Sequence, residues 1–202
     1  MPDTTNADEQ TLIQAAQRGS LKAFNVLVLR YQDVLYSLTY RIMGDAPSAS
    51  DATQEAFIAA YRQIKSYRGG SFRAWLLRIA TNSSYDELRR RKRRPAIAFE
   101  DLAPSDSDDE PPVPDSAATP EQALQDRELN RAIQDCINGL VEDQRVTLVL
   151  SDIEGLSYQE IADHTNAQIG TVKSRLSRAR ASIRHCLQAV QELLPGAYRL
   201  MQ

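Results

Sequence analysis

The strongest constraint on the fold is a central stretch, residues 95–120, that cannot build a core. It holds six of the nine prolines and is otherwise rich in serine, aspartate and glutamate, as in PSDSDDEPPVPDS. Such a composition buries too little apolar surface to offset the entropy lost on ordering, so we predict a flexible acidic linker. It divides the 202 residues into two small domains, 1–94 and 121–202.

Both domains carry apolar residues at helical spacing, and neither has a convincing strand pattern. The first domain has four such stretches. The third of them is expected to begin near Ser48 or Ser50, because Gly44 to Pro47 reads as the end of the second. In the second domain a helix starts at Pro120, and three more follow: Glu142 to about Glu154, Tyr158 to His164, and Ile169 to roughly Leu194. The sequence therefore predicts an all-α protein.

Charge is also distributed unevenly along the sequence. The net charge of -3 averages over opposite blocks, since residues 89–94 read RRRKRR while 95–126 contain nine acidic residues and no lysine or arginine. A basic run at the end of a helix indicates contact with a nucleic-acid strand, and nonspecific affinity is the simpler alternative.

The sequence does not favour a metalloprotein, a disulfide-rich protein, an enzyme or a membrane protein. Cys136 and Cys186 lack the CxxC or CxxH spacing of a metal site, so we expect two reduced thiols, no disulfide and no metal. His164 and His185 lie in no catalytic motif, and no phosphate loop or nucleophile elbow occurs, so we expect neither an enzyme nor a cofactor. Without a signal peptide or an apolar run of about 20 residues, the chain is predicted to be cytoplasmic and not to insert into a membrane.

The segment from Ser157 to Arg184 has the pattern of a helix-turn-helix. Ser157 and Glu160 form an S-x-x-E capping box that opens a short helix. The turn that follows contains Asn166, a residue type that tolerates positive φ. The next helix buries a stripe of apolar residues and presents threonine, serine, lysine and arginine on its opposite face. That cationic face suits a DNA major groove, and an ordinary amphipathic surface helix is the alternative.

This segment, EGLSYQEIADHTNAQIGTVKSRLSRAR, resembles region four of the extracytoplasmic-function (ECF, group IV) sigma factors of the sigma-70 family. The resemblance implies that the second helix reads the minus-thirty-five promoter element in duplex DNA. The residues that it assigns to this contact are Gly170, Thr171, Lys173, Ser174, Arg175, Ser177 and Arg178.

Two stretches of the first domain, AFNVLVLRY and SDATQEAFIAAY, resemble regions 2.1 and 2.2 of the same family. The resemblance implies that Asp51, Gln54 and Glu55 dock the clamp helices of core RNA polymerase. Asp51 and Glu55 are i,i+4 neighbours with Gln54 beside them, so the three form one polar, acidic patch that suits a basic partner. Taken alone, the patch could equally be a solvated helix face.

FRAWLLRIATNSSYDELRRRKRR, from Phe72 to Arg94, resembles regions 2.3 and 2.4, which hold the separated minus-ten strand. We expect Phe72, Trp75, Leu76 and Ile79 to form core and not a stacking platform. In the family, the preceding loop cups a flipped base. The residues predicted to bind single-stranded minus-ten DNA are Tyr67, Arg68, Gly69, Gly70, Ser71, Asn82, Asp86, Arg89 and Arg90.

The resemblance thus implies a sigma factor that brings core RNA polymerase to specific promoters in response to an envelope or environmental stress. It leaves open whether an anti-sigma factor is a further partner. A stand-alone helix-turn-helix regulator is the alternative, but it gives the first domain no purpose. The linker is either a tether or a segment that threads the polymerase cleft, and the tail 191–202 suggests no function.

Overall fold

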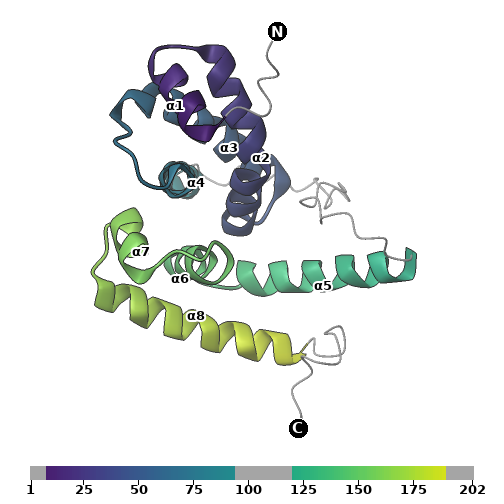
Figure 1. Cartoon of the computed structure of the whole chain (residues 1–202). Helices are drawn as coiled ribbons and strands as arrows, with labels where there is room; N and C mark the ends of the chain where they lie inside the picture. Colours follow the sequence, from purple (N-terminus) through teal and green to yellow (C-terminus); the bar gives the residue numbers. More distant parts are fainter. Residues whose placement is uncertain (1–7, 94–119, 190–202) are drawn as a thin grey trace. The chain divides into compact units, whose positions relative to one another are not determined.

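The computed structural model describes residues 8–93 and 120–189, which form two compact units (Figure 1). Within these residues all regular structure is helical, which confirms the predicted all-α class. None of the described helices is long and apolar enough to cross a membrane. The linker predicted for 95–120 lies outside the described residues apart from Pro120, as does the tail 191–202.

The first unit consists of α1 (Glu9–Gln17), most of α2 (Leu21–Met43), α3 (Ala46–Gln63), the short 3₁₀ helix η2 (Ile64–Ser66) and α4 (Phe72–Arg93). Its helices bury the apolar stripes that the sequence predicts. Fully enclosed side chains include Ile13, Leu27, Leu35, Phe72, Leu76 and Leu77. Small residues line the contact face of α3, where Ala49, Ala52, Ala56 and Ala60 are all buried.

Helix α3 begins at Ala46, earlier than the predicted start at Ser48 or Ser50. The cause is Asp45, whose Oδ1 accepts a hydrogen bond from the Ser48 N–H at 3.0 Å and so caps the helix. Pro47 then lies in the first turn, where its missing N–H costs nothing, and it does not end the preceding helix as the sequence suggested.

The second unit consists of α5 (Pro120–Asn138), α6 (Glu142–Leu148), the π-helical turn η3 (Val149–Ile153), α7 (Tyr158–Thr165) and α8 (Ile169–Ala189). Helix α8 packs against α5, α6 and α7 (Figure 1). The core of this unit includes Val146, Leu150, Ile161, Val172, Leu176 and Ala179. The segment predicted as one helix to Glu154 therefore ends in a π turn.

A disulfide joins Cys136 of α5 to Cys186 of α8, with their Cα atoms 5.7 Å apart. The prediction of two unpaired thiols was wrong, and among the described residues no cysteine remains free. The reason is tertiary, because packing of α8 against α5 brings together two residues that lie 50 positions apart in the sequence. Local spacing motifs cannot reveal such a pair.

Candidate functional site

The turn between α7 and α8 is built as the sequence predicts. Ser157 Oγ accepts from the Glu160 N–H at 3.3 Å, and the Ser157 N–H donates to Glu160 Oε2 at 2.9 Å, so the capping box is complete. Asn166 ends α7 in the left-handed region with φ 50°. The Ala167 N–H then donates to the Ala162 carbonyl at 3.0 Å, which closes the turn and directs α8 across α7.

Helix α8 separates an apolar from a cationic face. Val172, Leu176 and Ala179 are buried against the rest of the unit. Five of the residues predicted to contact duplex DNA are exposed on the opposite side: Gly170, Lys173, Ser174, Ser177 and Arg178. Lys173 and Arg178 form no ion pair with any residue that the structure describes. The helix thus presents two uncompensated cations on its exposed side.

The other two predicted contacts, Thr171 and Arg175, are half-buried. The guanidinium of Arg175 forms an ion pair with the carboxylate of Asp143 on α6. Its charge is therefore partly compensated within the protein, so Arg175 holds α8 in place as well as facing its predicted ligand.

A second ion pair holds α8, and the sequence analysis did not identify it. Arg180 Nε and Nη2 donate to the two carboxylate oxygens of Asp152 on η3, at 2.9 and 2.6 Å. The hydrogen bond from Arg180 lowers the pKa of Asp152, and that of Arg180 is raised in turn. The sequence contains a hint of this pair. Asp152 precedes a helix whose polar face carries lysine and arginine but no acidic residue, so an ion pair between the two could have been expected.

In the first unit, a groove of about 940 Å³ runs between α3 and α4. The sequence assigned residues of α3 to polymerase docking and residues of α4 to the minus-ten strand. The structure brings both sets to one groove, which is lined by Asp51, Gln54, Glu55, Ile58, Asn82, Asp86, Glu87, Arg90 and Arg93, among others. Of the minus-ten residues predicted on α4, Arg89 is not part of this lining.

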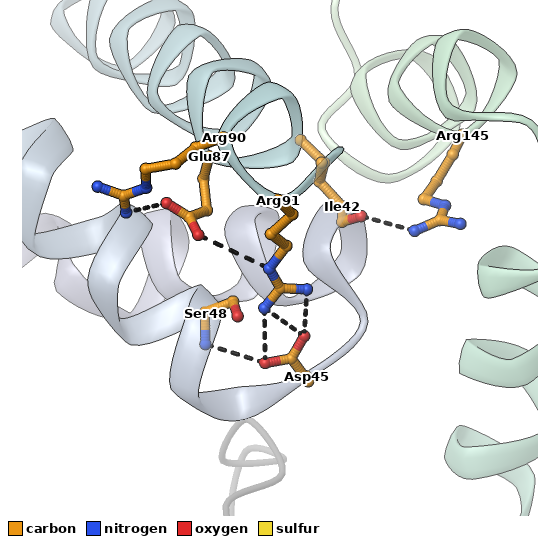
Figure 2. A network of polar contacts seen from close by, with 7 residues as sticks. All are labelled: Ile42, Asp45, Ser48, Glu87, Arg90, Arg91 and Arg145. Carbon is orange, nitrogen blue, oxygen red and sulfur yellow. Dashed lines mark hydrogen bonds and ion pairs between the residues drawn. The ribbon is translucent and has the colours of Figure 1, made fainter. Parts of the chain in front are cut away.

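The basic end of α4 is more heavily compensated than its sequence suggests. Arg91 contacts both carboxylate oxygens of Asp45, with a shortest distance of 3.0 Å, and its Nε lies 3.6 Å from Glu87 (Figure 2). Glu87 also pairs with Arg90. Arg89 lies 3.5 Å from Asp86. Every arginine from 89 to 91 therefore has a carboxylate neighbour.

The loop 67–71 divides into a buried anchor and an exposed tip. Tyr67 is only 7% exposed, and its hydroxyl donates to the Gly70 carbonyl at 2.7 Å. Burial, with a smaller contribution from Glu9, raises the pKa of this phenol. Gly69 and Gly70 have φ values of 104° and 93°, a conformation that favours glycine. Tyr67, predicted as a DNA contact, thus supports the loop from inside, whereas its neighbours at 68–71 are exposed.

Two further contacts hold this loop. Gln17 of α1 donates its side-chain N–H groups to the carbonyls of Ile64 and Tyr67, at 3.1 and 2.9 Å. Ser71 Oγ accepts from the Ala74 N–H at 3.1 Å and caps the start of α4. The role of Gln17 could not be predicted from the sequence, because a glutamine in the last turn of a helix is usually an ordinary surface residue.

Aromatic rings continue the support beneath the loop. Tyr67 lies 5.3 Å from Phe72 and 5.5 Å from Trp75, measured between ring centroids. Phe72, Leu76 and Ile79 are buried, as expected for core residues, whereas Trp75 is half-buried. The cluster packs edge to face and stacked, so it forms a rigid floor under the exposed tip.

Within the described ranges, no group of three or more His, Cys, Asp or Glu side chains could hold a metal ion. The arrangement instead offers a rigid loop, a charged groove and a cationic helix, all suited to macromolecular partners.

Comparison with known proteins bears on both units. Residues 27–94 match the family model described as Sigma-70 region 2, and residues 130–183 match Sigma-70, region 4. The chain is 39% identical to the RNA polymerase sigma-H factor of Pseudomonas aeruginosa over 91% of its length and 96% of that protein. It is also 39% identical to the ECF RNA polymerase sigma-E factor of Escherichia coli K12, over 89% of its own length and 94% of the relative.

A solved relative has the same fold. The sigma factor RpoE of Bartonella quintana, crystallised with the anti-sigma factor NepR, is 25% identical. It aligns with a TM-score of 0.63 over 83% of this chain and 98% of that one.

Proposed function

Because the chain belongs to the extracytoplasmic-function sigma factors of the sigma-70 family, we propose that its two units divide the tasks of promoter recognition. As a sigma factor, it binds core RNA polymerase and directs it to specific promoters. The first unit docks on polymerase through Asp51, Gln54 and Glu55, and the second reads the minus-thirty-five duplex through α8. The single observation that carries this assignment is the exposed, unpaired Lys173 and Arg178 of α8, which follows a helix α7 that starts with a complete capping box.

The minus-ten strand belongs to the first unit in this proposal. The exposed residues 68–71 offer backbone groups on a rigid aromatic floor, as a site for an extruded base requires. The predicted contacts with the strand extend from this loop to α4, where the groove is lined by Asn82, Asp86 and Arg90. Arg89 lies beside this wall and contributes charge to the strand's phosphates. Tyr67 acts from beneath and makes no direct contact in this scheme.

The acidic residues of α3 suit a basic partner helix. Asp51, Gln54 and Glu55 are exposed, and none of them is used in packing the unit. Their side chains can therefore bind polymerase without a rearrangement of the fold, which favours a docking role over a structural one.

We further propose that the protein acts in the cytoplasm, catalyses no reaction of its own and is held inactive by an anti-sigma factor. The Bartonella relative, solved with such a partner, supports the last point. A stand-alone regulator is not favoured, because the whole of region 2 accompanies the helix-turn-helix.

Run-off transcription with purified core polymerase and a genomic fragment library tests the function directly. Discrete starts that depend on this protein are expected, and aligned upstream DNA would then give both promoter elements. Sequence-specific duplex binding without any such start would favour the stand-alone regulator.

Paired variants test the division of tasks. Gln54→Ala with Glu55→Ala should weaken polymerase binding and leave duplex affinity unchanged, whereas Lys173→Ala with Arg178→Ala should do the reverse. Identical behaviour of the two pairs in polymerase pull-down and duplex titration would contradict the proposed division.

A further inference from the structure

The disulfide lies in the least buried part of α8. The fully buried residues of this helix, Val172, Leu176 and Ala179, lie between its first turn and its midpoint. The ion pairs of Arg175 and Arg180 hold its middle. After Ala179, no described residue of α8 is fully buried. The last turns of α8 are therefore held by the half-buried Ile183 and Leu187 and by the covalent link to α5.

The two cysteines are placed so that the bond forms between the packed helices. Their Cα atoms are 5.7 Å apart, inside the range of about 4.4–6.8 Å that disulfides require. Packing of α5 against α8 brings the two residues together. While this packing persists, the two thiols stay near one another after reduction, so the bond can form again.

The two sulfurs differ in access. Cys136 is 4% exposed, whereas Cys186 is half-buried near the end of α8. A small thiolate can attack Sγ of Cys186, forming a mixed disulfide and releasing the Cys136 thiolate, which takes up a proton. A second small thiol then displaces Cys186 as a thiol. In total, two small thiols are oxidised to their disulfide and the protein bond is reduced to two thiols.

We propose that Cys136 and Cys186 form a reversible redox site of the second unit, in which a low-molecular-weight disulfide is the oxidant and the corresponding thiol the reductant. Oxidation holds the end of α8 to α5 and stabilises the helix-turn-helix. Reduction removes this covalent link and lowers the stability of the unit. The effect on promoter binding rests on the proposed role of α8, but the redox change in stability does not.

The test uses the full chain in buffers of graded glutathione to glutathione disulfide ratio. Alkylation of free thiols, counted by mass spectrometry, should give a single transition of two thiols per chain. Thermal unfolding by circular dichroism should show the second unit melting at least about 10 °C higher in the oxidised state, because the bond closes a 50-residue loop. Two alkylated cysteines at every ratio, or equal melting temperatures, would overturn the proposal.

A matched variant separates the bond from general effects of the buffer. Cys136→Ala with Cys186→Ala should melt at one temperature in all buffers, near that of the reduced protein. A redox-dependent shift that persists in this variant would assign the effect elsewhere and overturn the proposal.

Duplex binding distinguishes this inference from the proposed function. With DNA from a promoter identified by run-off transcription, the oxidised chain should bind several-fold more tightly at temperatures where the reduced second unit begins to unfold. Equal affinity there would overturn the regulatory consequence. No duplex binding in either state, together with a shifted melting temperature, would count against the role of α8 and leave the redox site supported.

Discussion

Two exposed cations of α8, Lys173 and Arg178, stand apart from acids, whereas Arg89, Arg90 and Arg91 at the end of α4 are paired with carboxylates. Lys173 and Arg178 form no ion pair within the described ranges. Arg90 and Arg91 both contact Glu87, and Arg91 also contacts Asp45. A phosphate that approaches α8 meets unused charge, but one that approaches α4 must compete with an acid. A run of basic residues in the sequence is therefore a weaker guide to nucleic-acid affinity than the ion pairs that those residues form in the folded protein.

The largest effect should come from removing the uncompensated cations. Lys173→Ala with Arg178→Ala is expected to cost about 2–4 kcal/mol in duplex binding and to lower the salt slope of log K by about 2. Fluorescence anisotropy across a salt series measures both quantities. Lys22→Ala, which removes one exposed positive charge from the first unit, is the control and should change neither.

Next in size is the loss of Asp45, which both caps α3 and pairs with Arg91. Asp45→Ala should lower the free energy of unfolding by about 1–2 kcal/mol, since a cap contributes about 1 and an exposed ion pair less. Asp45→Asn keeps the cap acceptor and should cost only the ion pair with Arg91, whereas Arg91→Ala removes that pair and the contact with Glu87. Urea unfolding would contradict this division if the Asn variant were as unstable as the Ala variant.

The Asp152 and Arg180 pair should give a smaller, pH-dependent effect. The pKa of Asp152 is lowered in the folded protein, so its stabilising contribution is complete above the ordinary pKa of about 4 and is lost as the pH falls through the lower folded value. Asp152→Asn should therefore destabilise by up to about 1 kcal/mol at neutral pH, since the pair is partly exposed, and by nothing in strong acid. Urea titrations at several pH values measure this convergence, and a difference that grows in acid would contradict it.

The smallest effect is expected on α4. Arg89→Ala with Arg90→Ala should weaken binding of a single-stranded minus-ten oligonucleotide by less than about 0.5 kcal/mol per residue, because each arginine gives up a carboxylate partner when it meets a phosphate. A loss as large as that of the α8 pair would show that these carboxylates do not compete, and the contrast between the two surfaces would fail.

Local chemistry made the helix-turn-helix predictable. Ser157, Glu160 and Asn166 act within a few residues of one another, so their spacing alone determines the cap and the turn. The apolar stripe of α8 likewise follows from its period, and the all-α class follows from repeating that argument along the chain.

Contacts between distant residues could not be predicted in this way. Cys136 meets Cys186, and Arg175 meets Asp143, only after α8 has packed on the preceding helices. The start of α3 was misplaced because Pro47 fits both a helix end and a first turn, and only the cap by Asp45 decides between them. The residues predicted on α3 and α4 were identified individually, but their common groove depends on the packing of the two helices.

The two hydrogen bonds from Gln17 bear on how family members can be recombined. Helix α1 precedes the region 2 match, which starts at residue 27, yet it holds the carbonyls of Ile64 and Tyr67 at the base of the loop. In a chimera that joins the first helix of one sigma factor to region 2 of another, the residue that supports the loop would come from a different protein than the loop itself. Under the proposed role of the loop in binding the minus-ten strand, promoter preference in such hybrids should follow the origin of the amino-terminal helix as well as that of the loop.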